Sequence, residues 1–186
     1  QELIQRAGER AFEALRMDVY SRADFIVSDA DGEFYCLEMN ALPGMTAASL
    51  LPKAAKAAGC KFAVLTATHE TGFGLWQSDV NPYCLKAVKW KDGKGDIVRD
   101  FVNSCRKYGL QPGIYIGIRW NSLLGIHNFK AEGEGEFARN RQAWYKRLCE
   151  NMVTELCTRY GDLYMIWFDG GADNPRGDGP NVEPIV

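Results

Sequence analysis

Apolar and polar positions repeat with a different period in the two parts of the chain. From Glu2 to Leu15 the apolar residues recur at helical spacing, which predicts an amphipathic helix with a charged outer face. The β-rich runs from Ala23 to Val27 and from Glu33 to Met39 flank Asp-Ala-Asp-Gly, a sequence that favours a tight turn. The first part therefore predicts a helix and an antiparallel strand pair, followed by a loop and a short helix from about Ala54 to Ala58.

From Lys61 onward, continuous apolar strands alternate with helices. The strands are FAVLTA, GIYIGI and LYMIWFD, and helices are expected from about Asp96 to Tyr108 and from about Gly135 to Tyr160. Apolar strands that alternate with helices are typical of parallel βαβ units. Three strands are too few to close an eight-stranded barrel of about 250 residues, so the α/β fold is either an open sheet or part of a larger barrel.

Composition and charge exclude two classes of binding partner. The 186 residues are 46% hydrophobic and 25% charged, with a net charge of -2. Acidic and basic residues are interleaved and no apolar run spans a bilayer, so we expect neither nucleic acid nor membrane as a partner. The six cysteines lack a CxxC pair and are expected to be small buried hydrophobes. The chain begins at Gln1 rather than Met, which suggests a truncated amino terminus and leaves localisation open.

Polar side chains follow each strand of the second part. His69 and Glu70 follow the first strand, residues 119–121 (Arg-Trp-Asn) the second, and Asp169 the third. Because parallel strands end at one edge of a sheet, these residues are expected to converge on one site. Asp169 beside aromatic residues suits a carboxylate nucleophile acting on a sugar. Alternatively, His69 is an ordinary loop residue and Asp169 begins a turn with Gly170.

Three motifs of the second part resemble glycoside hydrolase family 29, the α-L-fucosidases, over roughly Ala57 to Gly171. They are THETGFGLWQS, KGDIVRDFVNSCRKYGLQPGIYIGI and LYMIWFDG, in that order. The resemblance implies strands two to four of a (β/α) barrel, a retaining mechanism and a fucosylated glycan as substrate. By the same resemblance Asp169 is the nucleophile, while the sugar is bound by four further residues: His69, Glu70, Trp167 and Tyr115.

The second carboxyl group of a retaining mechanism has no strong candidate in the chain. The resemblance places the acid/base glutamate several tens of residues beyond the nucleophile, whereas the chain ends at Val186. Asp173, Asp178 and Glu183 follow Asp169, but their context is typical of a loop. We therefore expect the fucosidase-like part to need no cofactor and to be inactive alone.

The hairpin of the first part carries oxygen ligands at magnesium spacing. Glu38 and Asn40 share one face of a strand because side chains alternate, and Asp24 lies on the partner strand. The alternative is a surface hairpin with scattered acids. A calcium loop starting at Asp29 is excluded, because its glycine and closing glutamate fall at the wrong positions.

The sequences SRADFIV and DGEFYCLEMNALPGMTAASLLP resemble the carboxyl-terminal end of a D-alanine:D-alanine ligase, an ATP-grasp enzyme. The resemblance implies that Mg²⁺ and ATP are bound, with Asp24, Glu38 and Asn40 as the metal ligands. It further implies roles for four other residues: Arg22 and the backbone of Gly44 stabilise an oxyanion, and Ser49 and Leu50 contact the second D-alanine. Arg16 and Asp18 are a competing match to the Arg-x-Asp element.

Together the two resemblances predict a ligase-like fragment over residues 1–58 and a fucosidase-like fragment over residues 59–186. The join is expected between about Pro52 and Lys61, because both families supply a helix there. The main functional hypothesis is a fucosidase-type hydrolase fragment. The alternatives are a ligase fragment of peptidoglycan precursor synthesis and an inactive fusion. Exposed strand edges predict self-association.

Overall fold

The computed structural model describes residues 2–14, 22–27, 34–40, 50–172 and 177–186. The chain divides into an amino-terminal unit, residues 1–44 and 49–51, and a carboxyl-terminal unit, residues 45–48 and 52–186. Among the described helices, none combines the length and apolarity needed to cross a membrane. The boundary expected between residues 58 and 59 separates the two family resemblances rather than two compact units, and it stays a prediction.

The amino-terminal unit contains one helix and one strand pair. Helix α1 spans Glu2–Ala14 and lies against strand β2, Phe34–Asn40, which pairs antiparallel with strand β1, Arg22–Val27. The register shifts between Asp24 and Phe25, which is a β-bulge. The helix and the antiparallel pair expected from the hydrophobic pattern are both present.

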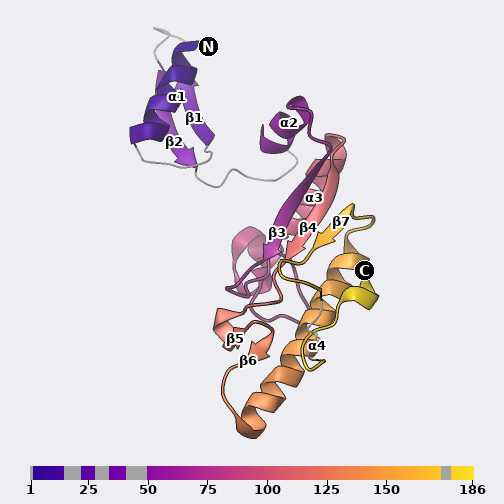
Figure 1. The fold of residues 1–186 in the computed structure, drawn as a ribbon. Helices are drawn as coiled ribbons and strands as arrows, with labels where there is room; N and C mark the ends of the chain where they lie inside the picture. Colours follow the sequence, from indigo (N-terminus) through magenta and orange to yellow (C-terminus); the bar gives the residue numbers. More distant parts are fainter. Residues whose placement is uncertain (1, 15–21, 28–33, 41–49, 173–176) are drawn as a thin grey trace. The chain divides into compact units, whose positions relative to one another are not determined.

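The carboxyl-terminal unit is built on a parallel sheet with the strand order β3-β4-β7 (Figure 1). Its chain order is strand, helix, strand, helix, strand, as predicted. The elements are β3 (Phe62–Thr68), α3 (Ile97–Lys107), β4 (Gln111–Ile116), α4 (Gly135–Arg159) and β7 (Met165–Trp167). The fold is thus α/β with a small parallel sheet.

Helix α2, Leu50–Ala57, leads into the sheet from the expected join. Its last turn is held within the carboxyl-terminal unit, because the ammonium group of Lys56 donates a hydrogen bond to the carbonyl of Gly109 at 3.0 Å. Ala55 packs against the same hydrophobic core as the strands. The end of α2 is therefore anchored to the second part of the chain.

The ends of α3 and α4 follow the expected capping chemistry. The Asp96 carboxylate accepts a hydrogen bond from the Arg99 amide at 2.8 Å and so caps α3. Gly109 and Gly161, just past the two helix ends, adopt φ of +67° and +70°. These left-handed conformations favour glycine and stop each helix.

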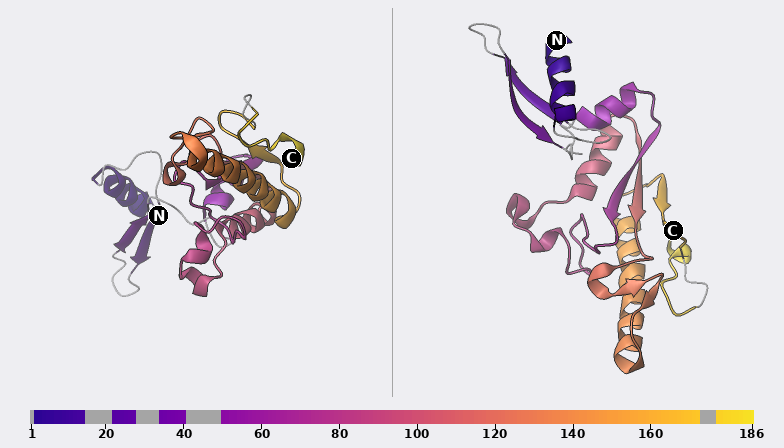
Figure 2. Two further views of the ribbon diagram at one scale, coloured as in Figure 1. Left: turned by 90° about the horizontal axis from the view of Figure 1, so that it is seen from below. Right: turned by 60° about the vertical axis from the view of Figure 1, so that its left-hand side comes forward.

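Short elements between β4 and α4 were not predicted. Strands β5 (Ile126–His127) and β6 (Lys130–Ala131) form a small antiparallel hairpin beside α4 (Figure 2). The structure also contains 3₁₀ turns, at Leu85–Ala87, Trp90–Gly93, Ser122–Leu124 and Glu183–Ile185. Elements of two to four residues are too short to carry a hydrophobic period.

The two faces of the parallel sheet differ in burial. Leu65, Ile114 and Ile166 pair across the strands, and all three pack in or against the core formed with α3 and α4. On the opposite face Thr66 pairs with Tyr115, which pairs with Trp167, and the Trp167 side chain is 51% exposed. One face is covered by helices, and the other is open at its β7 edge.

The described cysteines differ in burial. Cys60 is exposed, contrary to the expectation that the cysteines are buried, whereas Cys105 and Cys149 are fully buried. Burial raises the pKa of the Cys105 thiol to about 11 and that of Cys149 to about 12. The reactive thiolate is scarce at such a site.

We predict that a thiol reagent at pH 8 labels Cys60 in the native protein while Cys105 and Cys149 stay protected. The thiolate fraction falls tenfold for each unit by which a pKa rises, and burial also blocks access. Mass spectrometry of the labelled peptides measures each site, and the unfolded chain, in which all sites should react alike, is the control. Equal labelling of Cys60 and Cys149 in the native protein would contradict this packing.

Candidate functional site

Three neighbouring strands bring their polar and aromatic residues to one edge of the sheet. His69 and Glu70 directly follow β3, Tyr115 is the second-last residue of β4, and Trp167 ends β7 two residues before Asp169. The strands are parallel, so these positions share the carboxyl edge. The predicted convergence of the strand ends is present.

Tyr115 joins the two outer strands through its ring. It stacks on His69 with ring centroids 5.4 Å apart and an interplanar angle of 16°. It also meets Trp167 edge-on, with centroids 5.5 Å apart and an angle of 85°. The Tyr115 side chain is buried, whereas Trp167 is half-exposed and His69 exposed. The three rings form a continuous wall, which we call the aromatic wall.

Two carboxylates lie close to this wall. Burial raises the pKa of the Tyr115 phenol, and the negative charges of Asp169 and Glu70 raise it further. The phenol therefore stays neutral and able to donate a hydrogen bond at neutral pH. An aromatic wall beside exposed carboxylates suits a sugar ring, because the rings cover its apolar face and the acids accept from its hydroxyl groups.

The turn that carries His69 is held by the loop after β4. The Ser122 amide donates to the Glu70 carbonyl at 2.7 Å. Gly72 has φ of +78°, and a Cβ there would lie 2.4 Å from the side-chain nitrogen of Asn121. Only glycine fits this left-handed and crowded position, so the two loops keep a defined spacing.

Arg119 is one of the strand-end residues expected at this site, although no specific role was predicted for it. A Cβ at Gly170, φ +85°, would lie 2.5 Å from Arg119 Cδ, so the arginine packs directly on the residue after Asp169. Its Nε atom donates to the Asn128 side chain at 2.9 Å. The glycine following Asp169 was visible in the sequence, but its arginine neighbour comes from another strand end. Arg119 thus packs beside Gly170 at the third strand end.

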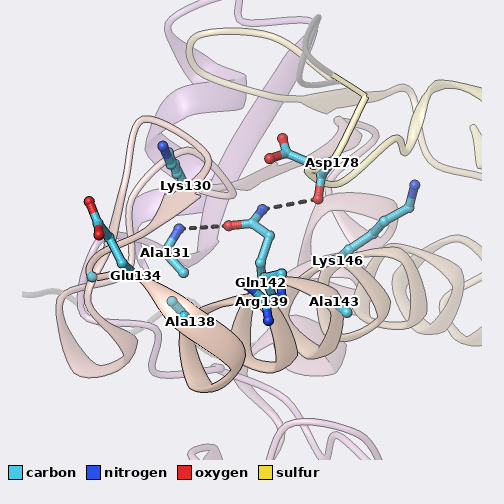
Figure 3. Close-up of a pocket in the computed structure, with 11 residues that line it drawn as sticks. Lys130, Ala131, Glu134, Ala138, Arg139, Gln142, Ala143, Lys146 and Asp178 are labelled. Atoms are coloured by element: carbon cyan, nitrogen blue, oxygen red, sulfur yellow. Dashed lines mark hydrogen bonds between the residues drawn. The ribbon is translucent and has the colours of Figure 1, made fainter.

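Two cavities lie in the loops after β4. One of 420 Å³ adjoins Glu70 and is lined also by Trp120, Ser122, Gly125, Ile126, His127 and Glu132. A second, of 430 Å³, lies between β6, the start of α4 and Asp178 (Figure 3). Asp178, one of the acids considered as acid/base, lines this second cavity. Asp173 lies outside the described residues, and Glu183 opens the last 3₁₀ turn.

The ligase-like residues are described only by their backbone. Asp24 is the strand partner of Glu38, and Arg22 is the strand partner of Asn40. The side chains of these four residues lie outside the described part of the structure. So do Gly44 and Ser49, the side chain of Leu50, and the competing pair Arg16 and Asp18.

Comparison with known proteins finds two families. The family model for alpha-L-fucosidase matches residues 46–183, and that for the D-ala D-ala ligase C-terminus matches residues 1–68. Alpha-L-fucosidase 1 of Arabidopsis thaliana is 30% identical over 125 residues, which are 67% of this chain and 21% of the plant protein. The D-alanine--D-alanine ligase of Flavobacterium johnsoniae is 52% identical over 61 residues, 31% of this chain and 18% of the ligase.

A solved structure is also similar. A Bacteroides thetaiotaomicron VPI-5482 protein that carries the name alpha-L-fucosidase is 93% identical, with a TM-score of 0.70, over 73% of this chain and 31% of that protein. The chain therefore spans about a fifth to a third of the relatives it matches. Because the alpha-L-fucosidase model matches more than half of its length, the chain belongs to the α-L-fucosidase family, and its first 68 residues match the D-ala D-ala ligase C-terminus.

Proposed function

We propose that the carboxyl-terminal unit is part of a retaining α-L-fucosidase site in which Asp169 is the nucleophile. The observation that carries this proposal is the aromatic wall of His69, Tyr115 and Trp167 at the strand edge where Asp169 follows. In a retaining mechanism one carboxylate attacks the anomeric carbon and a second carboxylic acid protonates the leaving oxygen. A fucosylated glycan is the proposed substrate.

Several residues at this strand edge would each contribute a contact to the sugar. Trp167 and Tyr115 offer ring surfaces, and the neutral Tyr115 hydroxyl can donate a hydrogen bond. His69 and Glu70, which are exposed on the same edge, can contact the sugar hydroxyl groups. Arg119 packs on Gly170, the residue after Asp169, and so helps to fix the backbone at this strand end.

We also propose that residues 1–186 do not hydrolyse natural fucosides by themselves. An alkoxide leaving group requires protonation by a second carboxylic acid. Asp178 lines the cavity beside Gln142 rather than the one beside Glu70. The sheet pairs as β3-β4-β7, and we propose that it corresponds to strands two to four of a (β/α) barrel.

A second candidate function concerns the hairpin β1–β2. The backbone register sets Asp24 opposite Glu38, with Asn40 two residues further along β2. Carboxylate and amide oxygens at these positions fit Mg²⁺, which would neutralise ATP phosphates. The unit would then be an ATP-grasp ligase fragment, with Arg22 and Gly44 at an oxyanion and Ser49 and Leu50 at D-alanine. The match to the ligase C-terminus over residues 1–68 supports this candidate.

The two matched ranges overlap over residues 46–68, which include the expected join between Pro52 and Lys61. This overlap supports the proposal that two enzyme fragments are fused through α2. A fusion in which neither part is active remains the third candidate. The two experiments that follow separate it from the first two.

Covalent trapping tests the nucleophile without requiring the acid/base residue. A related α-L-fucosidase from Bacteroides thetaiotaomicron has been captured as a covalent intermediate with 2-fluoro-fucosyl fluoride. Fluoride departs without protonation, so we expect this reagent to label the intact chain on the peptide containing Asp169. Mass spectrometry should find no adduct in Asp169→Asn and a normal adduct in Asp162→Asn. An adduct elsewhere, or none in the wild type, would contradict the assignment.

Calorimetry tests the ligase-like unit. If the hairpin binds magnesium and ATP, heat should be released when Mg²⁺ and ATP are added together, and Glu38→Gln should abolish it by removing a charged ligand. Glu9→Gln, on an exposed position of α1, is the matched control and should leave the heat unchanged. The absence of heat with the wild-type chain would count against this function.

Self-association follows from the edges of the sheet. Strands β3 and β7 are the outer strands, and Phe62, Tyr164 and Trp167 are 45%, 54% and 51% exposed. Unpaired edges with apolar side chains favour association. Light scattering after size exclusion should therefore detect dimers or larger species, and Trp167→Lys should shift the population toward monomer. A stable wild-type monomer with one cooperative melting transition would argue against it.

A further inference from the structure

Helix α4 carries two buried polar side chains that hold two different loops. Gln142 is 8% exposed and Glu155 is 5% exposed. Glu155 contacts the loop after β3, residues 69–84, which we call the histidine loop because it begins at His69. Gln142 contacts the hairpin β5–β6. The chain has two histidines, and each lies on one of these loops.

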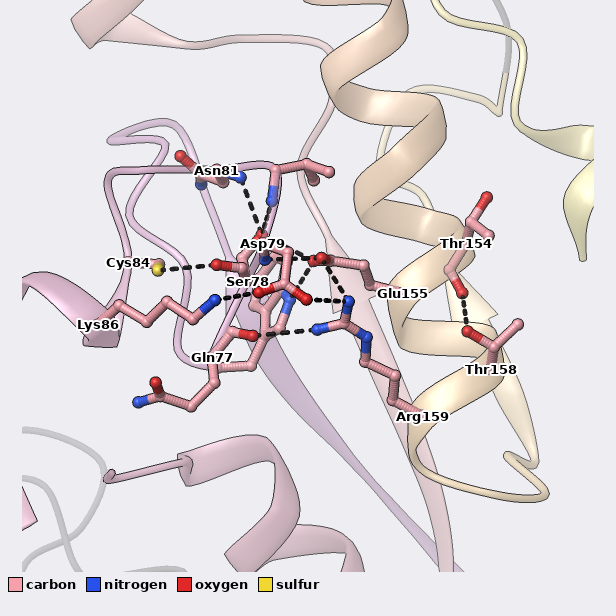
Figure 4. A network of polar contacts seen from close by, with 12 residues as sticks. Gln77, Ser78, Asp79, Asn81, Cys84, Lys86, Thr154, Glu155, Thr158 and Arg159 are labelled. Atoms are coloured by element: carbon pink, nitrogen blue, oxygen red, sulfur yellow. Dashed lines mark hydrogen bonds and ion pairs between the residues drawn. The ribbon is translucent and has the colours of Figure 1, made fainter. Parts of the chain in front are cut away.

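Glu155 gathers three donors from the histidine loop (Figure 4). Its Oε2 atom accepts from the Trp76 indole at 2.9 Å and from the Ser78 hydroxyl at 2.7 Å. Its Oε1 atom accepts from the Asp79 amide at 2.7 Å. These donors lie more than 70 residues away in the chain, so one carboxylate closes the loop onto the helix.

The contacts continue from Ser78 to His69. The Asn81 amide donates to the Ser78 hydroxyl oxygen at 2.9 Å, and the Asn81 side chain donates to the Gly72 carbonyl at 2.9 Å. The Gly72 amide in turn donates to the His69 carbonyl at 2.9 Å. Ser78 and Asn81 are 2% and 5% exposed. A buried hydrogen-bond chain therefore links Glu155 to the backbone of His69.

The negative charge of the buried Glu155 side chain is balanced by a neighbouring arginine. Arg159, one turn later on α4, approaches Glu155 Oε1 at 3.0 Å and also pairs with Asp79 at 2.6 Å. Asp79 is further paired with Lys86. A buried carboxylate is tolerated when it is paired and fully hydrogen-bonded. Loss of its acceptor oxygens would leave the Trp76, Ser78 and Asp79 donors unsatisfied.

We propose that Glu155 is a positioning residue that sets the place of His69 at the sugar-binding edge through Ser78, Asn81 and Gly72. This inference rests on the proposed sugar-binding role of His69. Glu155 itself lies in the interior of the unit and is proposed to act only through the histidine loop. A residue that merely stabilised the unit would affect both loops alike.

Gln142 provides a matched control on the same helix. Its side-chain oxygen accepts from the Ala131 amide at 2.6 Å, and its nitrogen donates to the Phe129 carbonyl at 2.9 Å. These residues follow His127 in the hairpin β5–β6, where Ala131 pairs with Ile126. The Gln142 nitrogen also donates to the Asp178 carbonyl at 3.1 Å. Glu155→Gln and Gln142→Glu are reciprocal exchanges of equal size, and the hydrogen bonds that Gln142→Glu removes do not involve the histidine loop.

The experiment records the imidazole proton NMR signals of His69 and His127 in the full chain, assigned with His127→Asn. Glu155→Gln should shift or broaden the His69 signal and leave His127 in place, whereas Gln142→Glu should do the reverse. Ser78→Ala, which cuts the chain of hydrogen bonds one step later, should reproduce the Glu155→Gln pattern. Ser78→Ala decides the question if Glu155→Gln does not fold.

Titration with L-fucose separates this inference from the proposed function. If the wild type binds L-fucose, Glu155→Gln should weaken binding by about tenfold, as expected for about 1.4 kcal/mol of lost positioning, and Gln142→Glu should not. If the wild type binds no L-fucose but the His69 signal moves selectively, the positioning role stands and the sugar-binding role of His69 is wrong. An unmoved His69 signal, or equal shifts of both histidines in both variants, would overturn the inference.

Discussion

The site depends on the parallel pairing of β4 with both β3 and β7. This pairing puts the strand ends on one edge and fixes which residues share a face: Tyr115 lies between Thr66 and Trp167, and Ile114 lies between Leu65 and Ile166. A shift of one residue in either pairing would exchange these faces. In the β4–β7 pairing such a shift would turn Trp167 toward the helices, and in the β3–β4 pairing it would separate His69 from Tyr115.

The helices contribute more than a cover for the apolar face. Helix α4 supplies core residues such as Leu156 and Met152, and it also presents Gln142 and Glu155 as hydrogen-bonding partners to two loops. A loop organised by hydrogen bonds to one rigid helix can hold polar groups in a defined place near solvent. The sheet determines which residues meet at the edge, and α4 determines how the histidine loop approaches it.

The predictions that succeeded concern local patterns. The strand runs, the Asp96 cap and the glycine stops at Gly109 and Gly161 are encoded within a few residues, and all are present. The convergence of the strand ends followed from parallel pairing alone. The Arg119 contact with Gly170 and the hydrogen bonds of Glu155 join residues far apart in the sequence. The local pattern of apolar and polar residues contains no information about such contacts. The exposed Cys60 shows that a preference for burial does not decide a single position.

The last turn of helix α2 packs in the carboxyl-terminal unit through Lys56 and Ala55, whichever of the two families the helix comes from.

The central claim is that the three strands bring His69, Tyr115 and Trp167 together, and nuclear Overhauser spectroscopy of the intact chain tests it directly. We predict cross-peaks between the ring protons of His69 and Tyr115 and between those of Tyr115 and Trp167. Their absence in the folded protein would contradict the parallel arrangement on which the proposed site is built.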